Sequence, residues 1–143
     1  MAYWMLKSET ETWSWDQQKK SGAKGAEWTG VRNYQARNNM RAMNVGDLGF
    51  FYLSGGDKCV VGIVKIVKEA HPDSTDPTGA WECVDVAAVT DLPKPVTLAE
   101  VKADKSLKDM VLVRNSRLSV QPVTPGEWRI VCRLGGLKSP PNA

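Results

Sequence analysis

The chain has 143 residues, the usual length of one domain, so we expect one domain and exclude most multidomain enzymes. Hydrophobic residues make up 42% of the sequence and charged residues 24%, which supports one buried core and excludes a disordered chain. The 19 basic and 16 acidic residues give a net charge of +3, which permits nucleic-acid binding but does not indicate it.

The N-terminal segment predicts a strand, a short helix and a loop. Residues 3–8 are rich in aromatic side chains and have the composition of a strand. Ser14 and Gln17 have the spacing of a capping box, so we expect a short helix to begin there and to end at Gly22. Glycines punctuate residues 22–30, which we expect to form a loop.

The next segment predicts a helix followed by a β-hairpin. Asn33 can cap a helix over residues 34–43. Residues 48–54 and 59–69 have the composition of two strands, and a glycine-rich turn at residues 55–57 separates them. The second strand is apolar on both faces in its first half, so we expect it to be central in a sheet.

The C-terminal half predicts a mixture of short elements. Residues 71–79 contain two prolines and no apolar pattern, which indicates a surface loop, and residues 81–89 return to the pattern of a strand. We expect a helix over residues 97–103, a strand over residues 118–120 and a capped helix over residues 124–135. Because the strands do not alternate regularly with helices, we predict an α+β fold with an antiparallel or mixed barrel.

Targeting and membrane signals are missing from this sequence. The longest apolar run lies within residues 59–67, which is too short to cross a bilayer. Lys7 and Glu9 interrupt the N-terminal apolar stretch before it resembles a signal peptide. We therefore expect a soluble cytoplasmic protein, with association with a nucleoid as an additional location, and we expect a monomer that does not bind membranes.

Cysteine and histidine are few, and the plentiful carboxylates do not occur in metal-ligand spacing. Cys59, Cys83 and Cys132 have no Cys-x-x-Cys pair and no nearby histidine, so we expect three buried thiols and neither a zinc site nor a disulfide framework. The single histidine, His71, precedes a proline in a predicted loop, which is a poor position for a catalytic base. No glycine-rich phosphate loop follows a strand, and we expect no cofactor.

Aromatic and basic groups that could bind a ligand are more abundant. Of the six tryptophans, we expect Trp4, Trp81 and Trp128 in the core, Trp13 and Trp15 packing a short helix on the barrel, and Trp28 lining a pocket. Aromatic faces beside hydrogen-bonding groups suit an unpaired base. Arginine clusters occur at Arg32, Arg37 and Arg41, at Arg114 and Arg117, and at Arg129 and Arg133, each of which could equally be a solvated surface.

Several stretches of sequence together form a specific pattern. Residues 28–38 read Trp-Thr-Gly-Val-Arg-Asn-Tyr-Gln-Ala-Arg-Asn, and residues 3–9 read Tyr-Trp-Met-Leu-Lys-Ser-Glu. Further matching stretches are residues 13–15, 46–52, 61–64, 76–77 and 116–123. Over nearly its whole length the chain resembles the EVE domain of the thymocyte nuclear protein type.

The resemblance implies a single domain over residues 1–138 with a flexible tail at residues 139–143. It implies a pseudobarrel of the PUA-like superfamily with short flanking helices, related to YTH and ASCH domains. It also implies a non-catalytic module that recognises a modified cytosine or adenine, in DNA or RNA. The base-binding residues expected by resemblance are Lys7, Ser8, Glu9, Trp28, Thr29, Gly30, Asn33, Tyr34 and Tyr52, and the phosphate-binding residues are Arg32, Arg37 and Arg117.

Two positions depart from the family pattern. Thr10 stands where the family usually has proline, which loosens a turn that proline would fix. Leu53 stands where many members carry histidine, so the predicted pocket loses a ring hydrogen-bonding group and becomes more apolar.

Three alternatives to a DNA reader remain open from the sequence. One is a reader of modified RNA such as transfer RNA, which rests on analogy with other PUA-like domains. The second is an enzyme acting on a small nucleobase or nucleotide, with Glu9 or Lys7 as acid or base. The third is a protein-interaction module whose aromatic cleft binds a peptide.

Overall fold

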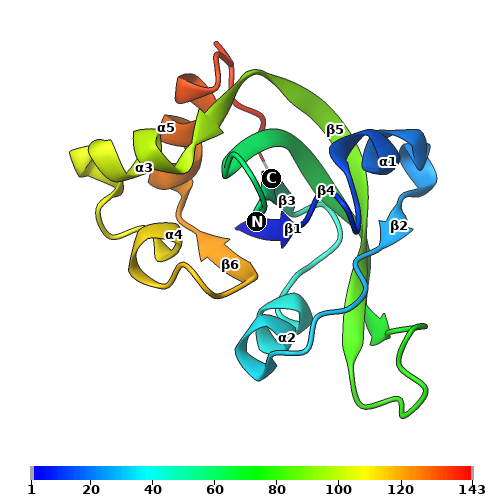
Figure 1. Cartoon of the computed structure of the whole chain (residues 1–143). Coiled ribbons are helices and arrows are strands. Elements are labelled where there is room, and N and C mark those ends of the chain that lie inside the picture. Colours follow the sequence, from blue (N-terminus) through cyan, green and yellow to red (C-terminus); the bar gives the residue numbers. More distant parts are fainter. Residues whose placement is uncertain (1, 143) are drawn as a thin grey trace.

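The computed structural model describes residues 2–142, which form a six-stranded mixed sheet (Figure 1). The strands are β1 (Tyr3–Ser8), β2 (Ala26–Glu27), β3 (Leu48–Leu53), β4 (Cys59–Pro72), β5 (Glu82–Thr97) and β6 (Val120–Val123). Their order is β2-β5-β4-β3-β1-β6, in which only β1 and β3 run parallel. β2 and β6 are the two edges, so the sheet is not closed into a barrel.

Curvature of the two long strands gives the sheet its barrel-like shape. In Figure 1, β4 and β5 bend around the short strands β1 and β3. The pairing of β4 with β5 shifts register in four places, the first between Val60 and Gly62. Each shift adds a local bend and twist to the strand that carries it. The predicted α+β class and mixed sheet are therefore confirmed.

Short helices flank the sheet, and most begin at a capping side chain. They are α1 (Trp15–Lys20), α2 (Tyr34–Arg41), α3 (Leu98–Ala103), α4 (Val111–Arg114) and α5 (Pro125–Leu134), with 3₁₀ turns at Gly22–Lys24 and Lys105–Leu107. Ser14, Thr97 and Thr124 each form a complete capping box, and Asn33 caps α2. These caps satisfy backbone amides, so the helices begin there. The predicted helix starts are therefore confirmed. Helices α3, α4 and α5 lie together on one side of the molecule, away from α1 (Figure 1).

The sheet has a hydrophobic cluster on each face. Successive side chains of a strand point to opposite faces, so Phe50 packs in one cluster and Phe51 in the other. The first cluster, under α3 and α5, contains Trp128 stacked on Phe50. The second cluster, under α2, contains Trp4 and Trp28. Trp4 and Trp128 are buried, as the sequence predicted.

Two tryptophans show how α1 and the β4–β5 hairpin are placed. Trp15 lies over Gly62 of β4, where a Cβ would come within 2.1 Å of the indole, so α1 packs on the sheet as expected. The prediction that Trp81 is core is wrong. It lies before β5, only partly buried, because its ring packs against Tyr34 on α2 instead of entering either cluster.

The prediction that His71 lies in a loop is also wrong. β4 continues past residue 69 to Pro72, and His71 pairs with Cys83 of β5. The far end of this hairpin is exposed, so it has no apolar alternation to reveal the strand. β5 similarly extends beyond the predicted residue 89 to Thr97.

The C-terminal segment that includes Pro141 lies beside the first cluster. The Trp128 indole donates a hydrogen bond to the Pro141 carbonyl at 2.8 Å, which joins the predicted tail to α5. The flexibility of residues 139–143 stays a prediction. Residue 143 of this tail and residue 1 of the predicted domain lie outside the described residues. In residues 2–142, no helix combines the length and apolar character needed to span a membrane.

Candidate functional site

The first pocket opens at the C-terminal end of β1, against β2 and the loop before α2. Its volume is about 390 Å³, within the usual range for small-ligand sites. Seven residues predicted from the sequence line it, namely Lys7, Ser8, Glu9, Trp28, Thr29, Gly30 and Arg32. The structure therefore brings together the two predicted segments, residues 7–9 and 28–32, although they are distant in the sequence.

Polar bonds around α1 fix one wall of this pocket. The Ser8 hydroxyl donates to the Trp13 carbonyl at 2.6 Å. The Trp13 indole donates to Gln18 Oε1 at 2.9 Å, and Gln18 in turn donates to the Val86 carbonyl at 3.0 Å. Gln18 is completely buried, so its bond to Val86 is shielded from water. This chain of bonds holds Trp13 at the pocket and makes the Ser8 hydroxyl a positioning group.

Trp28 forms the aromatic part of the opposite wall. Its backbone amide donates to the Val84 carbonyl at 2.8 Å, beside the short β2–β5 pairing. Its indole meets Phe51 edge to face, with ring centroids 5.5 Å apart and planes at 88°. Only 6% of Trp28 is exposed, and it lines the pocket. The aromatic surface available to a ligand is thus preorganised by packing.

A buried carboxylate holds the rim formed by residues 29–32. Asp73 accepts from the Gly30 amide at 2.9 Å and pairs with the Arg32 guanidinium at 3.1 Å. Gly30 has φ of 85°, a conformation that favours glycine. Burial alone would raise the pKa of Asp73, but hydrogen bonds from Thr75, Gly30 and Arg32 together lower it to about 2. The rim is therefore tied to the β4–β5 loop by an ionised group.

Asn33, Tyr34 and Arg37 lie outside the first pocket. Asn33 accepts from the Ala36 amide at 2.9 Å as the cap of α2. Tyr34 is 66% exposed, and its ring packs on Trp81 with centroids 5.0 Å apart. The Arg37 guanidinium lies 4.9 Å from the Tyr34 ring centroid and 5.4 Å from that of Trp81. Tyr34, Arg37 and Trp81 form an aromatic and basic surface beside α2, which we call the α2 platform.

A second pocket lies on the other side of the end of β1. Its volume is about 450 Å³, and it shares Lys7, Glu9 and Ser119 with the first pocket. Tyr52, predicted to contact a base, lines this second pocket instead of the first. Arg117 lines it as well, from the loop before β6. The predicted site residues are thus divided among two pockets and the α2 platform.

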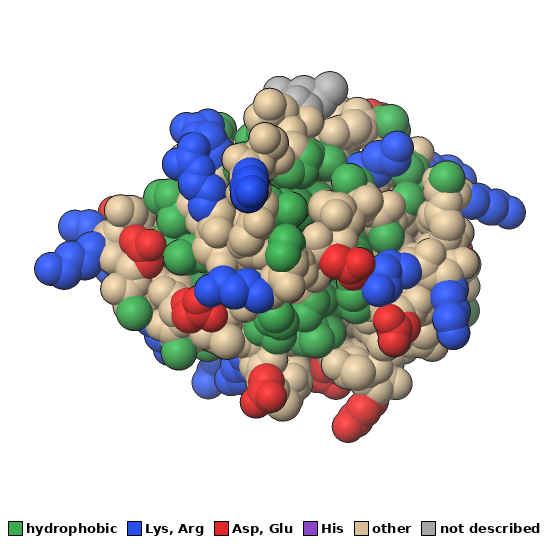
Figure 2. All heavy atoms as spheres, turned by 90° about the horizontal axis from the view of Figure 1, so that it is seen from above, with side chains coloured by type: hydrophobic (Ala, Val, Ile, Leu, Met, Phe, Trp, Pro, Cys, Tyr) green, Lys and Arg blue, Asp and Glu red, His purple; other side chains and the backbone are tan. Residues whose placement is uncertain are grey.

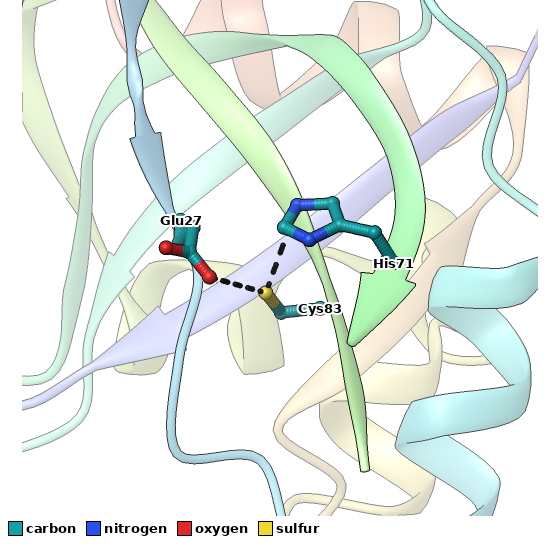
Figure 3. Close-up of side chains that lie close together, drawn as sticks. All are labelled: Glu27, His71 and Cys83. Carbon is teal, nitrogen blue, oxygen red and sulfur yellow. Dashed lines mark hydrogen bonds between the residues drawn. The ribbon is translucent and has the colours of Figure 1, made fainter. Parts of the chain in front are cut away.

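Behind the first pocket, the strands bring together a group that the sequence spacing had hidden. Glu27, His71 and Cys83 point toward one another from β2, β4 and β5, with one potential metal-ligand atom of each within 4.8 Å (Figure 3). The expectation that Cys83 has no nearby histidine is wrong, because the β4–β5 register places His71 Nε2 4.0 Å from its sulfur. All three cysteines are nonetheless buried and free, as predicted.

Hydrogen bonds already use the donor and acceptor atoms of this group. The Cys83 thiol donates to Glu27 at 3.5 Å, and His71 Nε2 lies 2.7 Å from Asp85. Burial, followed by the hydrogen bond to Glu27, raises the pKa of the Cys83 thiol. Burial alone would raise the pKa of Glu27, but hydrogen bonds from Ser74 and Cys83, together with the nearby His71, lower it. The group stabilises the backing of the pocket as a hydrogen-bond network.

Sequence reasoning missed several residues that line the pockets. Trp13 and Glu27 line the first pocket, Lys58 lines the second, and Ser119 lines both. The Lys7 amide donates a hydrogen bond to the Ser119 carbonyl at 2.9 Å, and this contact depends on the β1–β6 pairing. The richness of residues 13–15 in tryptophan was an available signal for Trp13, whereas Lys58 resembles any charged residue in a hairpin turn.

A family model described as "EVE domain" matches residues 2–134. The chain belongs to the EVE domain family. It is 38% identical to human thymocyte nuclear protein 1, in a match that covers 93% of this chain and 73% of that protein. The resemblance found in the sequence is therefore confirmed.

Solved structures of similar proteins have the same fold. A crystal structure of an Agrobacterium tumefaciens protein is 56% identical, with a TM-score of 0.93 and coverage of 98% of this chain and 97% of that chain. Human THYN1 protein, crystallised in complex with DNA containing 5-methylcytosine, is 36% identical, with a TM-score of 0.88 and coverage of 97% of this chain and 100% of that chain.

The predicted relation to YTH domains also holds at the level of fold. The YTH domain of the Zygosaccharomyces rouxii MRB1 protein is 15% identical with a TM-score of 0.60, over 99% of this chain and 88% of that chain. That identity is low, so the similarity concerns the arrangement of the strands and helices alone.

Proposed function

We propose that this chain is a non-catalytic reader of a modified base in DNA, with one base held in the first pocket. The observation that carries the proposal is the pocket itself, in which a fixed indole, Trp28, lies opposite polar groups at the end of β1. The similarity to human THYN1 protein, which was crystallised with DNA containing 5-methylcytosine, supports modified cytosine as the substrate class.

Energetics define how such a reader must work. Extruding a base from a duplex costs a few kcal/mol. Stacking on an aromatic side chain returns about 1 to 3 kcal/mol per base. The two effects nearly cancel, so the pocket supplies selectivity while contacts to phosphates supply much of the affinity.

Glu9 is the side chain best placed to identify the base. Its carboxylate lines the first pocket, is exposed, and has no hydrogen-bond or ion-pair partner among the described residues. A carboxylate accepts the exocyclic amino group of cytosine. The Ser8 hydroxyl and the Gly30 amide are instead occupied by bonds within the protein. We therefore assign amino-group recognition to Glu9 and positioning of the wall to Ser8 and Gly30.

Phosphate contacts surround the pocket in this proposal. Arg32 lies on its rim, and its charge is partly balanced by Asp73. Arg37 belongs to the α2 platform, where Tyr34 offers an exposed ring for a neighbouring base. On the face shown in Figure 2, Lys and Arg side chains are dispersed and interspersed with Asp and Glu. Local groups beside the pocket, instead of one broad basic face, would then direct the strand.

The proposal is tested by binding to matched oligomers. Fluorescence anisotropy would compare DNA and RNA oligomers that carry one cytosine, 5-methylcytosine, adenine or N6-methyladenine, at two salt concentrations. We expect selective binding of DNA with the modified cytosine. In Glu9→Gln we expect loss of the preference for cytosine oligomers over adenine oligomers, because Glu9 accepts from the amino group of cytosine. This substitution keeps the shape of an exposed side chain, so folding should be unaffected. Preference for modified RNA would move the substrate class to RNA, and equal binding of all oligomers would contradict a reader.

A further inference from the structure

The two pockets at the end of β1 are neighbours with different walls. Lys7, Glu9 and Ser119 border both, so the end of β1 and the residue before β6 form the partition between them. The first pocket contains two indoles, Trp13 and Trp28. In the second, by contrast, the ring is Tyr52, and it is almost completely buried. A planar base fits the first pocket better than the second.

The charges of the two walls differ as well. Lys7 and Arg32 balance Glu9 and Glu27 in the first pocket, leaving no formal net charge. In the second pocket, three cations face one carboxylate, which leaves a formal charge of +2; the cations are Lys7, Lys58 and Arg117 and the carboxylate is Glu9. A neutral ligand group suits the first wall and an anionic group suits the second.

None of the three cations in the second pocket has an ion-pair partner among the described residues. Lys7 donates to the Ser116 carbonyl and lies 5.4 Å from the centroid of the Tyr52 ring. Burial, and then the nearby charge of Lys58, lower the pKa of Lys7 to about 8. A partly desolvated cation beside a second cation gains stability from a bound anion.

The backbone fixes these cations from three separate elements. Lys7 belongs to β1, Lys58 to the β3–β4 turn and Arg117 to the loop before β6. The Lys58 carbonyl accepts the Leu98 amide at 3.0 Å, which ties the turn to the start of α3. The convergence is therefore a property of the fold, because the parallel β1–β3 pairing brings Lys7 beside Tyr52 and its hairpin.

We propose that the second pocket binds a phosphate group of the nucleotide whose base occupies the first pocket. Lys7, Lys58 and Arg117 would contact the phosphate oxygens. Glu9, which borders both pockets, would turn away from the phosphate and toward the base. The inference rests on the proposed function and deepens it, because it divides one nucleotide between two adjoining pockets. The phosphate could be a phosphodiester of a strand or the terminal phosphate of a free nucleotide.

Binding of 5-methyl-2′-deoxycytidine, its 5′- and 3′-monophosphates, a DNA oligomer with one such residue and the matching plain oligomer would test the proposal. The variant is Lys58→Ala, and the control is Lys65→Ala, which removes an exposed lysine of β4 that lines neither pocket. We expect Lys58→Ala to weaken oligomer binding about tenfold and to lower its salt dependence by about one ion, while Lys65→Ala has little effect.

The arms of the experiment separate the outcomes. If Lys58→Ala leaves the ratio of modified to plain affinity unchanged, a phosphate contact is supported. If Lys58→Ala also weakens binding of one monophosphate, a terminal phosphate is sufficient for that contact. A loss confined to the oligomer identifies a phosphodiester. Equal behaviour of Lys58→Ala and Lys65→Ala overturns the proposal. If the unaltered chain does not distinguish modified from plain base, the proposed reader fails separately, whatever Lys58→Ala does.

Discussion

Trp28 and Trp128 occupy comparable positions on opposite faces of one strand but have different surroundings. Trp128 is fully buried and stacks on Phe50, with centroids 4.1 Å apart and planes at 22°. Trp28 meets the next residue, Phe51, at 88° and borders the first pocket. Tight stacking leaves Trp128 no surface for a ligand, whereas the edge contact keeps part of Trp28 available. Trp128 therefore supports the fold, and Trp28 borders the first pocket.

The two regions are also held by different interactions. Around Trp128 the neighbours are apolar, and the tail carbonyl of Pro141 satisfies the indole. Around Trp28 the pocket walls depend on buried polar groups, Gln18 on one side and Asp73 on the other. Polar bonds fix direction as well as distance, so they suit a wall that must stay open.

The largest effect should follow from breaking the apolar region. Trp128→Ala removes a fully buried indole and should lower the free energy of unfolding by about 3 to 5 kcal/mol. Urea denaturation followed by circular dichroism measures this loss. Trp128→Phe, which keeps a ring against Phe50, should recover a large part of it. A loss below about 1 kcal/mol in Trp128→Ala would show that this stacking does not support the fold.

The corresponding change on the other face should mainly affect recognition. Trp28→Ala should remove base stacking worth about 1 to 3 kcal/mol and, with the indole wall of the pocket, abolish discrimination between modified and plain base. It should destabilise the fold less than Trp128→Ala, because the pocket already borders the indole. Affinities of the folded variant for matched oligomers measure the effect. An equal loss of affinity for both bases would contradict the assignment of Trp28 to the base.

Acid should weaken the rim of the first pocket through Asp73. A pKa lowered from 3.8 to about 2 means that ionised Asp73 adds stability above pH 3.8 and that this contribution is lost as pH falls toward about 2. Asp73→Asn should therefore cost about 1.5 kcal/mol at pH 6 and approach the unaltered chain at pH 2. Unfolding midpoints of both proteins across this range measure the difference. A constant difference would exclude the ionised rim.

The smallest effect should come from the α2 platform. Arg37→Ala should weaken binding to modified and plain oligomers alike and reduce the salt dependence by about one ion. The matched control is Arg129→Ala, because Arg129 is an exposed arginine of α5 that lines neither pocket. Titrations at several salt concentrations measure both variants. A change in the ratio of modified to plain affinity would instead place Arg37 in base recognition.

Local signals in the sequence predicted much of the fold. A cap and its amide lie three residues apart, so Ser14, Asn33 and Thr124 reveal helix starts without any knowledge of tertiary structure. Residues 48–53 likewise have the composition of a strand, although β3 is buried on both faces and its sequence does not show which side chains lie on each face. The family resemblance then identified the segments that form the first pocket.

The remaining features depend on register and packing that sequence patterns do not encode. His71 meets Cys83 because of several register shifts along β4 and β5, and each shift moves side chains relative to the partner strand. Trp81 lies outside the core because its ring packs against Tyr34 on α2. Lys58 and Lys7 are distant in sequence and meet only through the β1–β3 pairing.

A modified base that enters the pocket beside Trp28 should change the resonances of that indole among those of the six tryptophans. A ¹⁵N-labelled sample would be titrated with a DNA oligomer containing 5-methylcytosine and with its plain counterpart. We predict that the Trp28 indole signal shifts strongly with the modified oligomer while the Trp128 signal stays in place. A Trp28 signal that remains unchanged at saturation would show that no base enters this pocket.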